Sequence, residues 1–164
     1  MLSIQISDIK DFMSHLLSKD TFDHFYFIEA SIKMGVSYQI QGRINEGFYD
    51  TSVEQTLNRE FCYWKEIRHR IFDIIKGKRL PLSCKIVLGL SKQSISYLIA
   101  HNNSSFREED IEGIYINILY DPKNLLITTG ISYKNFSLDK SLEYAFDEYL
   151  AKFLKEKQLY SIII

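Results

Sequence analysis

Basic side chains crowd one short segment, residues 68–85, where six lysines and arginines stand against a single acidic residue, Asp73. The six are Arg68, Arg70, Lys76, Lys78, Arg79 and Lys85. Clustered cations of this kind bind the phosphates of nucleic acids or nucleotides. The same side chains also stabilise the C-terminal end of a helix, which needs no ligand. The net charge of the whole chain is −1, so no global positive field adds to the case for nucleic acid.

A second group of candidates combines ring surfaces with polar tips: His24, Tyr26, Tyr38 and Trp64. If a long helix packs over the strands that carry the two tyrosines, these side chains are expected to line a pocket for a small molecule. Asp23 directly precedes His24. The pair is either a base with its orienting carboxylate or the polar end of a loop.

The sequence contains none of the motifs that identify phosphate-binding loops, dinucleotide-binding turns, serine-hydrolase elbows or zinc proteases. Its seven glycines stand singly, so no glycine-rich loop can wrap a phosphate. Cys62 and Cys84 are 22 residues apart, without the close spacing of a zinc site. His69 and Asp73 share a helix face, which suits a solvated ion pair. We therefore expect no metal and no cofactor, and we assign no catalytic residue.

Two halves of the chain, residues 2–76 and 83–158, show the same order of elements: a strand, a helix, a two-stranded hairpin and a longer helix. Alternating apolar residues mark the first strand of each half. Ser7 and Ser91 then stand where the N-caps of the short helices are expected. The pattern predicts an α+β fold with about six mostly antiparallel strands and four helices. It also predicts a duplication in which the halves superpose through a pseudo-twofold axis.

The hairpins are expected at residues 26–40 and 114–131, with turns at 33–35 and 121–124. Alternation assigns four residues of the first strand to the core side: Tyr26, Ile28, Ala30 and Ile32. It assigns the following residues to the outward side: Phe25, Phe27, Glu29, Gln39, Gln41, Arg43, Tyr115, Asn117 and Leu119. Aromatic rings on an outward face need cover. Either the long helices supply it, giving helix, sheet and helix layers, or a partner or second copy does.

The longer helices are expected at residues 53–76 and 138–158, where apolar residues recur at spacings of three and four. Thr51 begins a capping-box pattern for the first, and Ser137 is the expected N-cap of the second. Gly77 suits the end of the first helix. Trp64 lies on the apolar stripe and is expected to be buried.

Length and composition indicate one domain over residues 1–164, because a chain of this size can bury its own core. Residues 77–83, between the two halves, are too few to separate independent domains. No basic leader is followed by an apolar stretch, and no apolar run approaches the ~20 residues that span a bilayer. We therefore expect no membrane association, a cytoplasmic location and reduced cysteines.

The chain contains the stretches SDIKDFM at 7–13, TFDHF at 21–25, IKGKRLPL at 75–82, and TG at 129–130 ahead of FSLDKSL at 136–142. These stretches resemble an uncharacterised protein family of anaerobic Firmicutes. The resemblance covers nearly the whole chain and implies no activity and no site residues. The doubled unit is also similar, at the level of pattern, to the building block of DNA sliding clamps. It differs in having long helices where a clamp unit continues with strands.

Taken together, these features favour a non-catalytic interaction module that binds a protein, a second copy of itself or nucleic acid. The alternative is a small-molecule-binding protein or an enzyme, with a pocket between the sheet and a long helix. A flat surface of continuous basic potential would favour the first. A deep pocket that gathers titratable groups would favour the second.

Overall fold

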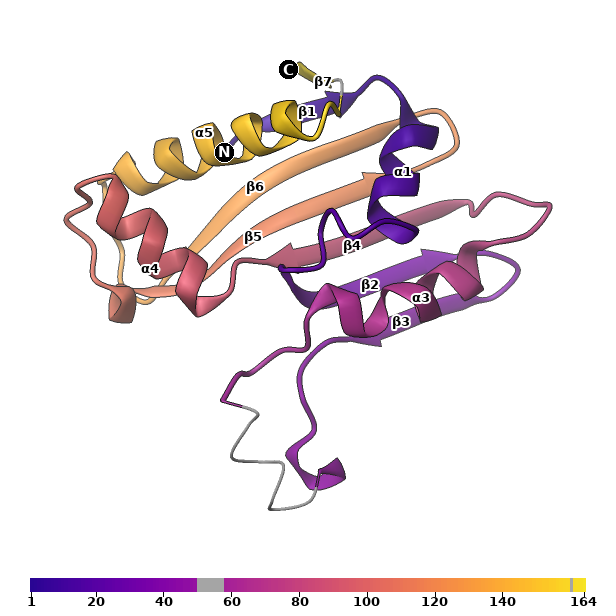
Figure 1. Cartoon of the computed structure of the whole chain (residues 1–164), viewed down its shortest axis with the longest axis horizontal. Coiled ribbons are helices and arrows are strands. Elements are labelled where there is room, and N and C mark those ends of the chain that lie inside the picture. Colours follow the sequence, from indigo (N-terminus) through magenta and orange to yellow (C-terminus); the bar gives the residue numbers. More distant parts are fainter. Residues whose placement is uncertain (50–57, 160) are drawn as a thin grey trace.

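The chain folds around a seven-stranded sheet with the strand order β3-β2-β4-β5-β6-β1-β7. The computed structural model describes residues 1–49, 58–159 and 161–164 (Figure 1). Its strands are β1 (Ser3–Ile6), β2 (Tyr26–Lys33), β3 (Ser37–Gln41), β4 (Ser83–Gly89), β5 (Ile111–Tyr120), β6 (Leu125–Tyr133) and β7 (Ser161–Ile163). Its helices are α1 (Ile9–Leu17), α3 (Trp64–Ile75), α4 (Lys92–His101) and α5 (Ser141–Glu156), with short 3-10 turns at Glu46–Phe48 and Glu108–Asp110.

Neighbouring strands of this sheet pair in the antiparallel sense. The prediction of an α+β fold with four helices and mostly antiparallel strands is therefore confirmed for the described residues. The sheet has one strand more than the six that we expected, because Ser161–Ile163 adds to the edge beside β1.

The two halves repeat their elements along the chain but not in the sheet. The order β1-α1-β2-β3-α3 is followed by β4-α4-β5-β6-α5. However, β4 pairs with β5, whereas β4, β5 and β6 separate β1 from β2. The first strand of each half therefore has a different neighbour. This strand order argues against a pseudo-twofold axis, and the duplication is not confirmed.

The four helices lie on one face of the sheet, which we call the helix face (Figure 1). Buried residues of all four helices join the strand residues of this face in one core. The strand residues include Ile4, Ile32, Ile86, Leu88, Ile116 and Ile127. The opposite face, which we call the open face, carries no helix among the described residues. The alternative of helix, sheet and helix layers is not found among the described residues, because most buried apolar side chains of the strands alternate onto the helix face.

A bulge in β2 reverses which residues before it face the core, whereas Ala30 and Ile32 after it are buried as predicted. The register with β4 shifts between Phe27 and Glu29, so Ile28 is the extra residue. Phe25 and Phe27, which alternation assigned outward, are fully buried against the helices. Tyr26 and Ile28 fall on the open face instead. A bulge places two residues of one strand opposite one of its partner, which shifts the alternation by one position.

The two longer helices, α3 and α5, begin later than their sequence signals indicate. The capping pattern at residues 51–54 lies outside the described residues. Residues 58–63 are not helical and lie beside β2 and β3 through the bridges Tyr26–Tyr63 and Arg43–Phe61. Helix α3 therefore starts only at Trp64. Before α5, the Asp139 carboxylate accepts the N–H of Ser141 at 2.8 Å, which delays the helix beyond the expected cap.

Two local predictions concern polar side chains that bind the backbone. Ser91 is the N-cap of α4, and its hydroxyl accepts the N–H of Ser94 at 3.2 Å, as predicted. The N-cap of α1 is Asp8 rather than the neighbouring serine. In the turn between β5 and β6, the Asp121 carboxylate accepts N–H groups from Lys123 and Asn124 at 2.8 and 2.9 Å. This turn is confirmed where the sequence placed it.

Candidate binding surface

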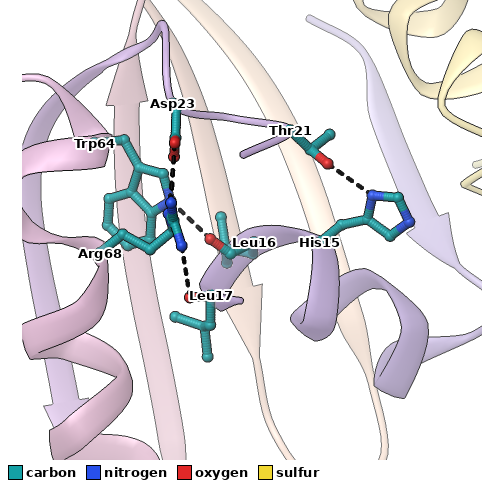
Figure 2. Close-up of polar contacts among 7 residues, drawn as sticks. All are labelled: His15, Leu16, Leu17, Thr21, Asp23, Trp64 and Arg68. Atoms are coloured by element: carbon teal, nitrogen blue, oxygen red, sulfur yellow. Dashed lines mark hydrogen bonds and ion pairs between the residues drawn. The ribbon is translucent and has the colours of Figure 1, made fainter. Parts of the chain in front are cut away.

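Arg68 lies inside the fold rather than on a phosphate-binding surface. Its guanidinium donates to both carboxylate oxygens of Asp23, at 2.8 and 2.9 Å, and to the carbonyl oxygen of Leu17 at 3.4 Å (Figure 2). A two-pronged contact of this kind fixes the orientation of both side chains. Arg68 therefore holds the segment after α1 against α3. Asp23 is committed to this contact rather than to orienting His24 as a base.

Trp64 supports the same helix end, one turn before Arg68 along α3. Its indole Nε1 donates to the carbonyl oxygen of Leu16 at 2.7 Å (Figure 2), and the side chain has no exposed surface. The last carbonyl groups of a helix have no partner within the helix. Trp64 and Arg68 together satisfy two of them in α1. The predicted burial of Trp64 is confirmed, so this residue does not line a pocket open to solvent.

The next basic residues are exposed around the C-terminal end of α3. Arg70 lies on the outer side of the helix, and Lys76 pairs with Asp73 at 2.9 Å. Lys78 and Arg79 follow in the exposed connection to β4. Their position at a helix end agrees with a role in balancing the helix dipole.

Lys85 lies on the opposite side of the sheet from α3. Its neighbours Cys84 and Ile86 are buried on the helix face, and strand alternation turns Lys85 to the open face. The six basic residues therefore do not form one surface. Arg68 is paired within the fold, and the sheet separates Lys85 from the rest.

The four residues expected to line a pocket are also dispersed. Trp64 is in the core, and Tyr38 lies opposite Ile32 on the edge strand β3. Tyr26 lies on the open face, opposite Gly89. His24 is exposed in the segment before β2, with its ring tilted against that of Phe25. The cavities lined by described residues include none of the four.

The open face is built from cross-strand rows of mostly uncharged side chains. One row crosses all seven strands, through Gln39, Ser31, Lys85, Leu119, Leu126, Gln5 and Ile162. The row beside it runs through Gln41, Glu29, Val87, Asn117, Thr128 and Ser3. A third row contains Tyr26, Gly89, Tyr115 and Gly130. The face is therefore continuous, and its centre is apolar to weakly polar.

A hollow of about 690 Å³ lies on the first row, near the turn between β5 and β6. Its lining includes the apolar Leu119 and Leu126 and the charged Lys33, Lys85 and Asp121. Its volume is in the range of small-molecule sites. It lies on the open face and not between the sheet and a long helix, where the sequence led us to expect a pocket.

The third row ends in a cluster of rings and guanidinium groups. The ring of Tyr26 lies 5.2 Å from that of Tyr63 and 6.3 Å from that of Phe61, measured between centroids. The guanidinium carbons of Arg43 and Arg59 lie 5.2 and 4.6 Å from the centroids of Phe61 and Tyr63. Cations over aromatic faces are attracted by the ring quadrupole, which holds these side chains in place.

The arginines of this cluster are neutralised within the chain. Arg43 pairs with Glu60, and Arg59 donates to the Glu66 carboxylate at 2.8 Å. The hydrogen bond from Arg59 holds the pKa of Glu66 below its ordinary value, so the carboxylate stays charged. These two arginines therefore present no unpaired positive charge to a phosphate.

The buried titratable groups do not resemble activated nucleophiles or bases. Burial raises the pKa of Cys84 to about 12 and raises that of Cys62 above its usual value, so both remain thiols at pH 7. Burial also raises the pKa of Tyr115. No three His, Cys, Asp or Glu side chains gather into a metal site in the part of the chain that the structure describes. Within that same part, no helix combines the length and apolarity needed to cross a membrane.

His24 is the histidine with a shifted pKa. Its ring centroid lies 4.3 Å from that of Phe25 and 5.8 Å from that of Phe153. Burial is the main cause that lowers its pKa below 6.5, and the charge of Lys157 adds to it, while Asp23 opposes both. As the pH falls below 6.5, the unfolded chain binds the proton before the folded protein does. The neutral imidazole therefore contributes stability above pH 6.5 that is lost as the pH falls through the pKa of the folded state.

Replacing Lys157 by methionine is expected to raise the pKa of His24 while leaving it below 6.5, because burial remains. The measurement is a titration of the His24 ring protons by NMR in the native protein and in Lys157→Met. Lys152→Met, a change at an exposed lysine of α5, is the matched control and should leave the titration unchanged. Equal pKa values in the native protein and Lys157→Met would contradict this electrostatic account.

Sequence reasoning found part of the open face and missed the rest. Tyr115, Asn117 and Leu119 were assigned outward, and the strand register confirms them. Leu126 and Thr128 were missed, although they alternate with the buried Leu125, Ile127 and Thr129. This alternation is a usable signal. Leu126 and Thr128 lie beside Gln5 and Lys85 only because of the order of the strands in the sheet. No local sequence pattern predicts that order.

Comparisons with known proteins give the chain a family but no activity. No curated protein and no solved structure matches it. A family model described as a family of unknown function, DUF5721, matches residues 15–161. The match covers most of the sheet and all helices except the first turns of α1. The chain therefore belongs to the DUF5721 family.

Proposed function

We propose that this chain is a non-catalytic protein-binding module whose binding surface is the open face of the sheet. The observation that carries this proposal is the row through Lys85, Leu119, Leu126 and Gln5, in which an exposed and a half-buried leucine lie between polar side chains. An apolar centre with a polar surround is the usual anatomy of a protein interface. The neutral thiols and the absence of catalytic motifs support the non-catalytic part of the proposal.

Charge favours a protein over nucleic acid as the partner. The three rows contain one lysine, Lys85, and one carboxylate, Glu29, among otherwise uncharged side chains. Nucleic-acid interfaces are instead markedly positive, because they neutralise several phosphates. The expected partner is a protein surface with apolar and uncharged polar side chains. The likeness to sliding-clamp units is limited to the order of secondary-structure elements, and this proposal does not rest on it.

The test places a photo-crosslinking amino acid at Leu126 on the open face, with Tyr144 on α5 as the matched control position. Tyr144 is exposed on the helix side of the molecule. In cells of the native host, a discrete protein adduct is expected from position 126 and not from position 144. The partner is then purified, and its binding to the native chain and to Asn117→Arg is measured by calorimetry. A loss of at least tenfold is expected from the charge in the middle of the face.

Two results would contradict the proposal: identical adducts from both positions, or equal affinity of the native chain and Asn117→Arg. A gel-shift titration at two salt concentrations addresses nucleic acid directly. We expect no binding that falls steeply with salt. If such binding occurs and is lost in the double variant Lys78→Glu, Arg79→Glu, the basic end of α3 is the functional surface instead.

A small molecule in the hollow over Leu119 and Leu126 is the second candidate. The observation that favours it is the volume of about 690 Å³ with Lys33 and Lys85 in its lining. Such a ligand would place a negative charge near the two lysines and a hydrogen-bond donor near Asp121, which also lines the hollow. Thermal-shift screening with carboxylate and phosphate compounds distinguishes the two candidates, since Lys85→Ala would abolish a small-molecule shift.

A further inference from the structure

The edge strand β3 lacks the features that usually prevent strands from pairing with another chain. It stands at one end of the sheet, and its five residues, Ser37 to Gln41, include no charged residue and no proline. Natural edge strands are commonly protected by lysines, prolines, bulges or covering loops. The opposite edge, β7, has only three residues. Strand β3 is therefore the better edge for adding a further strand.

The hydrogen-bond pattern identifies which backbone groups of β3 point outward. The N–H of Gly42 donates to the carbonyl oxygen of Ile28 at 2.8 Å, so residue 42 bonds toward β2. Alternate residues of an antiparallel strand bond to opposite sides. Residues 38 and 40 therefore also bond toward β2, whereas Ser37, Gln39 and Gln41 direct their N–H and C=O groups away from the sheet.

The chain beyond β3 leaves this outer side clear among the described residues. The carbonyl oxygen of Gly42 accepts the N–H of Cys62 at 2.9 Å, and the N–H of Ile44 donates to the carbonyl oxygen of Glu60 at 2.9 Å. Residues 42 and 44 both bond toward the inner side. Residues 60–62 thus insert between the extensions of β2 and β3 rather than covering the edge.

We propose that β3 pairs with β3 of a second copy of this chain, antiparallel and across a twofold axis at Gln39. This register places Gln39 opposite itself and Ser37 opposite Gln41 of the copy, so each pair joins outward groups that lack a partner in the sheet. Hydrogen-bonded pairs of this kind exchange two bonds each. On the helix face the register sets Tyr38 opposite Ile40 of the copy, an aromatic and β-branched pair that stabilises sheets.

A second copy fits this edge better than an unrelated strand, because the sequence of β3 is complementary to itself in this register. No like charges meet, and the ring of Tyr38, 38% exposed, gains an apolar neighbour. A twofold pair also closes on itself, whereas pairing of β3 with β7 would continue into a filament. The two open faces would join into one continuous surface. This inference goes beyond the proposed function and does not depend on it.

The test measures the mass of the native chain by sedimentation equilibrium and compares it with Gln39→Pro. The native chain is expected at twice its 19.3 kDa at micromolar concentration. Proline removes the outward N–H at the axis without removing a bond to β2, so it should be tolerated at this edge position. The dissociation constant of the dimer should rise at least tenfold in this variant. Gln39→Thr, which keeps the N–H, is the matched control and should remain a dimer.

A pair of oppositely charged variants at residue 39 tests whether this residue lies on the twofold axis of the proposed dimer. Gln39→Lys and Gln39→Glu each place like charges together at a twofold axis, so each is expected to be a monomer alone. Mixed together, with one of them carrying a fluorophore, they should form a dimer. A monomeric native chain would overturn the proposal and leave the edge to a partner protein. A dimer that Gln39→Pro and the like charges do not weaken, or no dimer on mixing, would overturn it as well.

Discussion

Replacement of Trp64 by alanine is expected to lower the free energy of unfolding by about 3–5 kcal/mol, the range for removal of a large buried aromatic. The ring is fully buried and lies 5.6 Å from that of Phe27 between centroids. Its loss leaves a cavity between α3 and the sheet. It also leaves the carbonyl oxygen of Leu16 without its donor at the end of α1.

Chemical denaturation followed by far-UV circular dichroism measures this loss, because Trp64 is the only tryptophan and the variant lacks its fluorescence. Trp64→Phe separates the two causes: it keeps an aromatic ring but loses the hydrogen bond, and should cost about 1–3 kcal/mol. Tyr97→Ala, at an aromatic residue 58% exposed, is the control and should stay within about 0.5 kcal/mol. A loss below about 1 kcal/mol for Trp64→Ala, or red-shifted native emission, would contradict the role of this side chain.

Local features of this fold were predictable because they depend on neighbours in the chain. Three examples are the turn at residues 121–124, the cap at Ser91 and the burial of Trp64. Each depends on the types and spacing of residues that are close together in the sequence. The bulge at Ile28 was not predictable, since it exists only in the pairing of β2 with β4. Strand β1 pairs with β6, so residues more than one hundred positions apart in the sequence become neighbours. No local sequence pattern predicts this pairing.

The candidate sites show the same division. Arg68 and Lys85 are close in the sequence and were therefore assigned to one basic segment. Closeness in the sequence does not determine on which side of the sheet each residue lies. Arg68 instead pairs with Asp23, whose role as a partner has no sequence signal. The open face was visible in part, because alternation alone places Tyr115 and Leu119 outward. That the open face is continuous could not be predicted without the order of the strands in the sheet.

Replacement of Gly42 by alanine is expected to lower the free energy of unfolding by about 3 kcal/mol, the upper end of the usual cost of overpacking. An added Cβ would lie 1.8 Å from the carbonyl oxygen of Phe27. Backbone, unlike a flexible side chain, cannot swing away from such a contact. Gly42 is also held through both of its backbone groups, because its N–H donates to Ile28 and its carbonyl oxygen accepts the N–H of Cys62. Relief of the clash would break at least one of these hydrogen bonds.

Two other glycines are matched controls for this measurement. In Gly113→Ala the new Cβ would meet the phenol oxygen of Tyr115 at 2.1 Å, and this side chain can rotate away at a smaller cost. In Gly130→Ala no atom lies within 4 Å, so the change should be close to neutral. The expected order of destabilisation is therefore Gly42, then Gly113, then Gly130. A neutral Gly42→Ala would contradict the close approach of this residue to β2. It would also remove the anchor that sets which residues of β3 point outward, on which the proposed pairing of two copies depends.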